Sequence, residues 1–467
     1  MAFMANWYDD MIYRKIPGLA NNLDAPLVGW VGDDFTGAAA VMEVLSFAGL
    51  PSLLFLAPPK EDELADCAGL AAIGIATLAR SKSPDWMAEH LPPLYRFMDQ
   101  VGAGLVHYKI CSTLDSAPHV GSIGKAIELG REIFGAAGVP VVTAAPELRR
   151  YQAFGSLFCS AMDRVYRLDR HPVMAHHPVT PMAEADVARH LSHQTEIETG
   201  CVDLEDLAAG RGAERLGSAD NIWSVDMMNE DHQARVGALL WEGRKERRFV
   251  VGSQGIEYAL VSYLQASGQL DSDKTPGGLG ANPRIAVVSG SVSPISAAQI
   301  GWARANGFTT IRLGAADICR GGDQAEAAEA AAFDAAKAAL YAGAPPLIFT
   351  AEGPDDPATA EVDAVAGDDP AGAQELIGKA LGRLLHRLIV EMDLTRVAVS
   401  GGDTSGHACE ALGIYALEAV APTIPGAAIN RARAKGRMNG LEIALKGGQM
   451  GSPDFFGWVR DGGGARP

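Results

Sequence analysis

Two adjacent carboxylates, Asp33 and Asp34, lie in the segment GDDFTGA at residues 32–38, directly after a short apolar run. At the start of a helix, such a pair can accept hydrogen bonds from substrate hydroxyl groups or coordinate a magnesium ion. Asp and Thr are also favoured helix N-caps, so capping is the alternative role. The pair is the first candidate for chemistry in this chain.

Two cations follow later apolar runs. Arg80 comes after one such run, and Lys109 begins the polar stretch KICSTLDS at residues 109–116. A guanidinium can hold a carboxylate through two parallel hydrogen bonds, and a lysine ammonium supplies a point charge. Each residue alone is readily explained as a solvated surface side chain, but together with Asp33 and Asp34 they indicate a site for a small acid.

Three segments rich in small residues lie in the second half of the chain: SGSVSP at residues 289–294, SGGDTSG at 400–406 and KGGQMG at 446–451. Small residues allow backbone amides to approach an anion, and a helix N-terminus adds a favourable dipole. These segments match neither the GxxxxGK[ST] nor the GxGxxG pattern, and tight turns are the alternative explanation. As phosphate-binding loops they would suit a nucleotide.

The elements that must position these residues are read from short apolar runs that alternate with longer helical stretches, a pattern typical of βαβ units and a largely parallel sheet. Ligands of such sheets bind beyond the carboxyl ends of the strands, where the candidate residues stand. The predicted strands are residues 27–31, 52–56, 70–76, 105–109, 139–143, 248–251, 285–289, 309–313, 347–350, 397–400 and 441–445. The predicted helices are residues 38–48, 84–100, 293–306, 324–341 and 371–390, and residues 145–245 look less regular.

Length and composition predict a globular protein of more than one domain. The chain has 467 residues, 48% of them hydrophobic and 21% charged, and the stretch at residues 266–283 is rich in Gly and Pro. We therefore expect a leader at residues 1–26, an α/β domain at 27–265, a linker at 266–283 and a second α/β domain at 284–467. The fold expected is two three-layer α/β/α domains with largely parallel sheets and an active-site cleft between them.

Charge and cysteine usage exclude several classes of protein. With 39 Lys and Arg against 57 Asp and Glu, the net charge is −18, which disfavours a nucleic-acid partner. No stretch predicts a transmembrane helix or an export signal, and six scattered cysteines form no CxxC motif, so a cytoplasmic protein with free thiols is expected. His176 and His177 are adjacent and fit no HExxH pattern, so no metal ligands are assigned and structural or surface roles are expected.

Taken together, these motifs resemble the four-carbon acid sugar kinases, formerly a domain of unknown function, whose members act on D-threonate, D-erythronate and 3-oxo-tetronates. The resemblance covers residues 28–457 and depends on the order of GDDFTGA, Arg80, YKICSTLDS (108–116), GSIGKA (121–126), HPVTPM (177–182), SGSVS (289–293), SGGDTSG (400–406) and KGG (446–448).

The resemblance implies that the first domain binds a sugar acid and the second binds ATP. The substrate site implied is Asp33, Asp34, Arg80, Lys109, Ile110, Cys111 and Ser112. The ATP site implied is Ser289, Ser291, Gly401, Gly402, Asp403, Thr404, Gly447 and Gly448. Two segments depart from the family pattern. Many members have KxGxFG where this chain has KGGQMG, and Ala117, Pro118 and His119 stand beside the substrate loop.

We therefore expect an ATP- and Mg²⁺-dependent kinase that phosphorylates the terminal hydroxyl of a small sugar acid: a tetronate, a 3-oxo-tetronate or a relative such as 3-oxo-isoapionate. Phosphoryl transfer depends mainly on positioning and charge stabilisation. Asp34 and Asp403 are both candidates for the carboxylate that orients or deprotonates the hydroxyl. The alternatives are an NAD-dependent dehydrogenase, which lacks its GxGxxG fingerprint here, and a non-catalytic sugar-acid sensor. The sequence leaves a homo-oligomer open.

Overall fold

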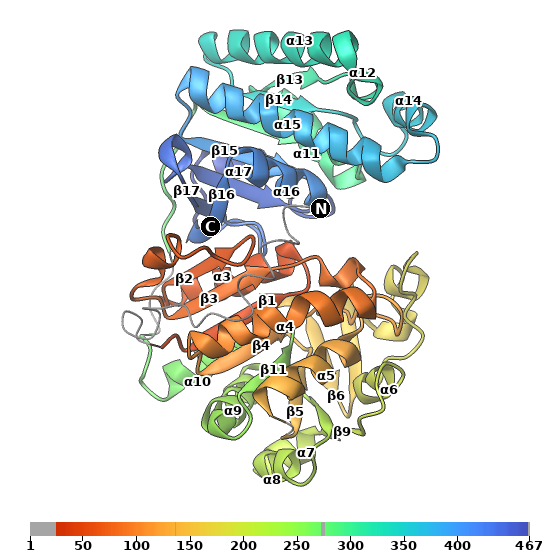
Figure 1. Cartoon of the computed structure of the whole chain (residues 1–467), viewed down its shortest axis with the longest axis vertical. Helices are drawn as coiled ribbons and strands as arrows, with labels where there is room; N and C mark the ends of the chain where they lie inside the picture. Colours follow the sequence, from red (N-terminus) through yellow and green to blue (C-terminus); the bar gives the residue numbers. More distant parts are fainter. Residues whose placement is uncertain (1–24, 136, 272–275, 466–467) are drawn as a thin grey trace. The chain divides into compact units, whose positions relative to one another are not determined.

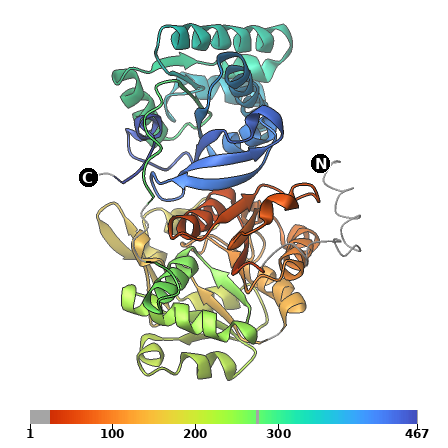
Figure 2. The ribbon, with the colours of Figure 1, turned by 90° about the vertical axis from the view of Figure 1, so that its left-hand side faces the viewer.

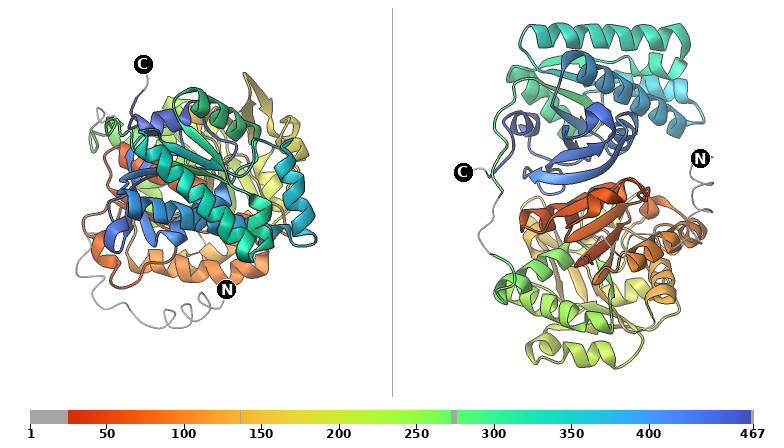
Figure 3. Two further views of the ribbon diagram at one scale, coloured as in Figure 1. Left: turned by 90° about the horizontal axis from the view of Figure 1, so that it is seen from above. Right: turned by 60° about the vertical axis from the view of Figure 1, so that its left-hand side comes forward.

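The computed structural model describes residues 25–135, 137–271 and 276–465 (Figure 1). Its contacts divide the chain into two compact units, Met1–Lys274 and Thr275–Pro467. Each unit is a mostly parallel sheet with helices on both faces, as Figure 2 and Figure 3 show in other views. This confirms the predicted fold class, whereas the predicted cleft between the domains stays a prediction. The predicted leader lies outside the described residues except for residues 25 and 26.

The described part of the first unit contains a parallel sheet with the strand order β2-β3-β1-β4-β11-β5-β10-β9. Its strands are β1 (Val28–Gly32), β2 (Ser52–Phe55), β3 (Ala72–Ala76), β4 (Leu105–Lys109), β5 (Val139–Val142), β9 (Thr199–Val202), β10 (Ile222–Val225) and β11 (Phe249–Gly252). A small antiparallel sheet is made of β6 (Arg150–Ala153), β7 (Ser156–Ala161) and β8 (Arg164–Arg167).

Helices α4 (Pro84–Gln100) and α5 (Ile123–Phe134) pack together, and α10 (Gly255–Ala266) packs against both α3 (Phe35–Phe47) and α9 (Glu230–Glu242). Shorter helices are α6 (Val187–Ser192), α7 (Leu204–Ala208) and α8 (Gly212–Gly217). The central strand β1 is buried along its whole length, which explains its continuous apolar run. Trp30 of β1 occupies the space beside Gly74 of β3, where a Cβ would lie 1.9 Å from the indole ring, so only glycine fits there.

The described part of the second unit has the strand order β13-β14-β12-β15-β18-β17-β16. Strands β12 (Ile285–Ser289), β13 (Thr309–Arg312), β14 (Pro346–Phe349), β15 (Arg396–Ser400) and β18 (Glu442–Lys446) are parallel, and β17 (Ile429–Ala434) pairs antiparallel with β18 and with β16 (Ile414–Ala421). The helices are α11 (Pro294–Ala305), α12 (Ala315–Arg320), α13 (Gly322–Tyr341), α14 (Pro357–Ala366), α15 (Pro370–Met392), α16 (Gly402–Ala411) and α17 (Phe455–Arg460).

Every predicted strand is present, with ends that match or differ by at most two residues. The region at 145–245, expected to be less regular, contains β6 to β10 and α6 to α9. Most of these elements are only four to six residues long, so their periodicity is too short to read. Helix α3 begins at Phe35 rather than at residue 38, because Asp34 caps it.

The predicted linker at 266–283 is not a free segment throughout. Residues 272–275 lie outside the described residues, but further along, Leu279 N donates to Gly462 O and Asn282 N to Arg460 O, each at 2.8 Å. Residues 279–282 therefore run along the C-terminal segment of the second unit.

Candidate functional site

The first candidate site lies where the connections of the first sheet diverge. The chain goes from β1 to β2 and β3 on one side and then to β4 on the other, as the order β2-β3-β1-β4 requires. Gly32 at the end of β1 pairs with both Ala76 of β3 and Lys109 of β4, so the three strands end level. Open α/β sheets bind ligands at such a switch point, beyond the carboxyl ends of the strands.

Arg80 joins the two carboxylates that follow β1. Its Nε donates to Asp33 Oδ2 at 3.0 Å, and its Nη2 donates to Asp33 Oδ1 at 2.7 Å and to Asp34 Oδ1 at 2.6 Å. The edge of the guanidinium expected to hold a substrate carboxylate is thus occupied by Asp33. Arg80 organises the site, and a substrate acid would have to share it with two carboxylates.

Burial and the charge of the partner shift the pKa of Asp33, and likewise that of Arg80, in opposite directions. Burial raises the pKa of Asp33, although the charge of Arg80 opposes that shift. For Arg80, burial alone would lower the pKa, but the charges of Asp33, Cys111 and Asp34 and the hydrogen bond to Asp33 together outweigh it and hold the pKa well above its ordinary value. Arg80 therefore remains a cation at any pH at which the protein is folded.

Three charged groups surround the bare Cα of Gly37. A Cβ on Gly37 would lie 2.4 Å from Asp34 Oδ1, 2.7 Å from Lys109 Nζ and 3.6 Å from Arg80 Nη2. Asp34 also accepts a hydrogen bond from Gly37 N at 3.0 Å, so it caps α3 and faces the site at once. Capping and function, which the sequence offered as alternatives, are compatible in this residue.

Lys109 is buried, and in the described part of the chain its Nζ donates one hydrogen bond, to Ile110 O at 2.7 Å. An ammonium has three donors, so Lys109 keeps capacity for an anion. Ile110 is fully buried, its N donates to Gly252 O at 2.7 Å and its O accepts from Lys109, so it positions Lys109. Cys111 Sγ lies 3.0 Å from Thr113 Oγ1, and Ser112 O faces the Cys159 thiol at 3.9 Å. The structure thus brings Asp33, Asp34, Arg80 and Lys109 together, and we call these four residues the acid site.

The motif HPVTPM supplies contacts that the sequence analysis did not assign. Thr180 is buried and its Oγ1 donates to Asp115 Oδ1, while Thr180 N donates to His177 Nδ1 at 3.1 Å. The segment at 177–182 is therefore fastened to the loop that follows Lys109. His177, expected to be structural or on the surface, holds a turn beside the substrate loop, and the only signal for this was the motif itself.

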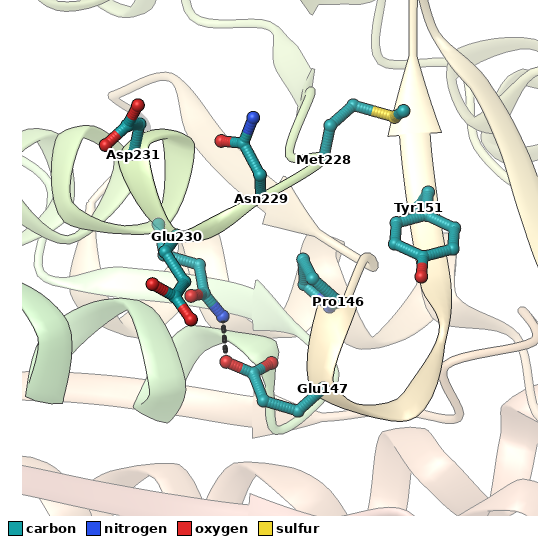
Figure 4. A pocket seen from close by; sticks show the side chains of 8 residues that line it. Pro146, Glu147, Tyr151, Met228, Asn229, Glu230 and Asp231 are labelled. Carbon is teal, nitrogen blue, oxygen red and sulfur yellow. Dashed lines mark hydrogen bonds between the residues drawn. The ribbon is translucent and has the colours of Figure 1, made fainter.

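A cavity of about 510 Å³ opens at the same edge of the sheet, beyond β5 and β10 (Figure 4). Its lining includes Glu147, Glu230 and Asp231, and Glu147 accepts a hydrogen bond from Gln233. Among the residues that the structure describes, none of the predicted site residues lines it, and its lining contains no Lys or Arg. A carboxylate ligand would meet like charge there, so the acid site is the better candidate for an anion.

The second candidate site lies at the switch point of the second sheet, between β12 and β15. Ser289 at the end of β12 pairs with Ser400 of β15, which in turn pairs with Lys446 of β18. Three loops therefore leave the sheet at one level, and we call residues 289–293, 401–404 and 446–448 the nucleotide loops. Gly290 N donates to Ser400 O at 3.1 Å and Gly401 N to Lys446 O at 2.9 Å, which joins them.

Glycine is required where the nucleotide loops meet. A Cβ on Gly448 would lie 2.3 Å from Ser291 Oγ, and one on Gly290 would lie 2.3 Å from Thr404 Oγ1. Gly401 has φ +125°, a conformation that other residues rarely adopt. The loops therefore present backbone rather than side chains, as a phosphate-binding site needs.

Helix α16 adds free donors to these loops. It starts at Gly402, so the amides of Gly402, Asp403 and Thr404 have no acceptor within the helix. Amides of this kind bind phosphate well. The Ser289 hydroxyl is buried and has no hydrogen-bond partner in the described part of the chain, which also fits a site completed by a ligand.

Lys446, which the sequence analysis left out of the site residues, is the cation of this second site. It is buried, and its Nζ donates to Gly447 O at 3.1 Å and to Ser296 Oγ at 3.5 Å. Burial lowers the pKa of Lys446 to about 8. The sequence analysis placed it at the start of the segment KGGQMG but assigned only the two glycines that follow it to the site.

The segment KGGQMG at residues 446–451, which departs from the family pattern, is held against α11 by hydrogen bonds. Ser293 Oγ donates to Gly448 O at 2.5 Å, and Gln299 Nε2 donates to Met450 O at 3.0 Å and to Ser452 O at 3.1 Å. This segment therefore keeps its place although it lacks the phenylalanine of the family pattern.

Two general observations complete the description: within residues 25–135, 137–271 and 276–465 no cluster of three or more His, Cys, Asp or Glu side chains could hold a metal, and no helix is long and apolar enough to cross a membrane.

Comparison with known proteins finds one family model for each of the two units. Residues 28–260 match a family model described as a sugar-binding N-terminal domain, and residues 286–456 match one described as a nucleotide-binding C-terminal domain. The chain is similar in fold to a crystal structure of a Salmonella typhimurium LT2 protein, with a TM-score of 0.72, 25% sequence identity, and coverage of 92% of this chain and 97% of that one.

Two relatives have named activities. A 3-oxo-isoapionate kinase of Paraburkholderia graminis is 43% identical over 93% of this chain and 94% of its own length. A 3-oxo-tetronate kinase of Methylobacterium radiotolerans is 30% identical over 93% of this chain and 98% of its own length. These matches confirm the predicted family and the predicted phosphotransferase class. The chain therefore belongs to the four-carbon acid sugar kinase family.

Proposed function

We propose that the chain transfers the terminal phosphoryl group of ATP to the terminal hydroxyl of an oxo sugar acid, with 3-oxo-isoapionate as its preferred acceptor. The observation that carries this choice is the 43% identity to a 3-oxo-isoapionate kinase over nearly the whole chain, against 30% to a 3-oxo-tetronate kinase over the same share. The acid site and the nucleotide loops support it, because each has the charge and backbone chemistry that its ligand needs.

In this proposal the substrate carboxylate binds Lys109. Lys109 Nζ has donors to spare, and the missing side chain of Gly37 lets it lie close to the start of α3. Arg80 contributes positive charge to the same place, although Asp33 occupies its edge. Ile110 positions Lys109 through its carbonyl oxygen, and the loop residues Cys111 and Ser112 contribute small polar groups around the acid.

Asp34 is the carboxylate we assign to the acceptor hydroxyl. Its Oδ1 accepts from Arg80 and from Gly37 N, which fixes the side chain, and in the described part of the chain no hydrogen bond is made to Oδ2. Asp34 is 26% exposed, so that oxygen is accessible. Phosphoryl transfer needs mainly orientation of the nucleophile, which a fixed carboxylate provides.

The nucleotide loops fit the phosphates of ATP, since their glycines let the loops come close together and α16 offers free amides. Residues 289–291, 401–404 and 446–448 would hold the phosphates, with Lys446 as their cation. ATP supplies the phosphoryl group, and Mg²⁺ bound to it neutralises charge while keeping several water ligands. Asp403, exposed in the first turn of α16, is the carboxylate we assign to orienting that Mg²⁺.

The test is ADP release measured with ATP and a panel of acids: 3-oxo-isoapionate, 3-oxo-tetronate, D-threonate and D-erythronate. We expect kcat/KM for 3-oxo-isoapionate to exceed that for 3-oxo-tetronate about tenfold, the discrimination that one small substituent usually allows. Equal or better turnover of 3-oxo-tetronate would overturn the substrate choice. Tight binding of an acid with no ADP release would instead favour a non-catalytic sugar-acid sensor. Binding of NADH, with no binding of ATP, would favour an NAD-dependent dehydrogenase.

The same assay separates the two carboxylates. Asp34→Asn should lower kcat about a hundredfold, because it removes the group that orients the acceptor hydroxyl. Asp403→Asn should act through the Mg²⁺ dependence and the KM for ATP. The control is Asp85→Asn, an exposed carboxylate in the first turn of α4. Full activity of Asp34→Asn would remove Asp34 from the mechanism.

A further inference from the structure

Strand β8 (Arg164–Arg167) is the edge of the small antiparallel sheet, whose order is β6-β7-β8. It pairs with β7 on one side, and in the described part of the chain no strand pairs with its other side. Most of its residues are exposed. An open edge of this kind is a template for pairing with another strand, and natural proteins usually block it.

Exposed apolar side chains gather on this sheet and on the segment that follows it. They are Phe154, Met162, Val165, Val173 and Val179, and no other stretch of this length in the described part of the chain has as many. Met162, in the turn between β7 and β8, is 83% exposed, and Val165 of β8 is 44% exposed. Apolar surface that is concentrated in one part of a protein indicates an interaction surface.

Asp226 fastens the sheet to the rest of the first unit. This carboxylate follows β10, is fully buried, and accepts hydrogen bonds from Phe154 N at 2.5 Å and Gly155 N at 3.0 Å, in the turn between β6 and β7. It also accepts one from Gln152 Nε2 at 3.2 Å. Figure 2 shows the sheet, in yellow, at the margin of the unit. Strand β8 is therefore a preformed edge that is held in one place.

The backbone groups of Val165 point outward from this edge. Ser160 N donates to Arg149 O at 3.1 Å, so the backbone polar atoms of Ser160 face β6. Ser160 pairs with Val165 across β7 and β8, and in an antiparallel sheet such a pair exchanges no hydrogen bonds. The N–H and C=O of Val165 therefore point away from β7, where no group of the described residues pairs with them.

We propose that β8 pairs antiparallel with β8 of a second copy of this chain, in the register that places Val165 opposite Val165 of the second copy. A dimer with a two-fold axis brings the same surface of both copies together, as a strand edge does when it pairs with itself. The two Val165 residues then exchange both of their backbone hydrogen bonds. In the same register Asp163 of each copy lies opposite Arg167 of the other.

Charge selects this register among those that the edge allows. Registers that keep Val165 hydrogen-bonded differ by steps of two residues. A step in one direction would place Asp163 opposite Asp169 of the second copy, and a step in the other would place Arg164 opposite itself. Arg167 binds Asp169 of its own chain through Nε at 2.7 Å and Nη2 at 2.5 Å, which leaves Nη1 for Asp163 of the second copy. Charges that usually block an edge are thus self-complementary here.

The first test measures the mass of the full chain by light scattering over a range of concentrations. The wild type should be a dimer at about 100 µM and dissociate on dilution with a Kd on the order of 10 µM, because a short strand pair buries less area than a standard interface. Asp163→Arg and Arg167→Asp should each be monomeric, since each places like charges opposite one another. A wild type that stays monomeric at about 100 µM would overturn the proposal.

An equimolar mixture of these two variants tests the register itself. In the mixed pair, position 163 of each copy again faces the opposite charge at position 167 of the other, so a heterodimer should form about as tightly as the wild-type dimer. A mixture that remains monomeric would show that the register is wrong. The control is Asp334→Arg, at an exposed carboxylate on α13, which should dimerise as the wild type does.

A third variant, Val165→Pro, removes the outward N–H without taking a hydrogen bond from the chain itself. Proline is tolerated where the N–H of an edge strand faces solvent, so denaturant unfolding of this variant should resemble that of the wild type, while its dimer should be lost. If Val165→Pro dimerises as tightly as the wild type, the dimer uses another surface and the proposal is wrong. The interface contains no residue of the acid site or of the nucleotide loops, so these outcomes are independent of the proposed function.

Discussion

Arg80 donates hydrogen bonds to both carboxylate oxygens of Asp33, from Nε at 3.0 Å and from Nη2 at 2.7 Å, although the two residues are 47 positions apart in the sequence. Asp33 is only 4% exposed, so its charge has little access to water and depends on this partner. The pair closes the junction between the loop after β1 and the loop after β3. Its removal should therefore affect stability as well as activity.

Arg80→Met should lower the free energy of unfolding by about 3 kcal/mol, because it leaves a buried carboxylate without its counter-charge. Denaturant unfolding monitored by circular dichroism measures this loss. The double variant Arg80→Met with Asp33→Asn should regain part of it, since the uncompensated charge is then gone. A double variant less stable than Arg80→Met alone would show that the pair is not what stabilises the junction.

Lys446 should make nucleotide binding depend on pH. Burial lowers its pKa to about 8 from the ordinary 10.5, so the ammonium is present below that pH and lost above it. ATP affinity, measured by calorimetry on either side of pH 8, should fall as the pH rises through this value. Lys446→Met should bind ATP weakly and without this step. A step that persists in Lys446→Met would assign the titration to another group.

The same residue should affect stability in the opposite direction. Between about pH 8 and pH 10.5 the unfolded chain keeps the Lys446 proton, whereas the folded chain has released it. The unfolded state then binds more protons, so the free energy of unfolding should rise with pH across this window through Lys446. Comparison of denaturant unfolding of the wild type and Lys446→Met at both ends of the window isolates that contribution.

Gly448→Ala should raise the KM for ATP about tenfold and leave the KM for the acid unchanged, because the new Cβ would lie 2.3 Å from Ser291 Oγ and must push two nucleotide loops apart. Gly301→Ala on α11 is the matched control, as its Cβ would meet nothing within 4 Å. Steady-state kinetics with each substrate varied in turn gives both constants. An unchanged KM for ATP would mean that residues 446–448 do not contact the nucleotide.

Thr180→Val should raise the KM for the acid while ATP affinity stays the same. The substitution keeps the shape of the side chain but removes the hydroxyl that bonds to Asp115, and a buried carboxylate bond of this kind contributes about 1.5 to 3 kcal/mol. The loop after Lys109 should then lose its fixed position. Thr309→Val on the exposed face of β13 is the control. Equal effects of Thr180→Val on both substrates would indicate general destabilisation.

The sequence was sufficient to predict eleven of the parallel strands and the polar segments that follow them, because central parallel strands are continuous apolar runs and the polar residues after them stand out; it did not predict β9, β10, β16 or β17. It was not sufficient for features that depend on distant partners. The hydrogen bonds from Arg80 to Asp33 require β3 to lie beside β1, and no local sequence pattern predicts which strands are neighbours in the sheet. Lys446 was quoted in KGGQMG but not assigned to the site for the same reason, because its burial is a property of the folded sheet. The short antiparallel strands β6 to β8 carry too few residues for a period to appear.

Because β12, β15 and β18 end level, the place where a ligand is held and the identity of that ligand are set by different residues. The spacing between Ser289, Ser400 and Lys446 is set by the hydrogen bonds of the sheet interior, where a slip of one residue would shift a loop by about 3.3 Å and reverse its side chains. The loops therefore do not have to specify their own positions. Substitutions that spare the close contacts of Gly290 and Gly448 can change which ligand is held without moving the place where it is held, so specificity in this fold is able to diverge while the stability of the core stays the same.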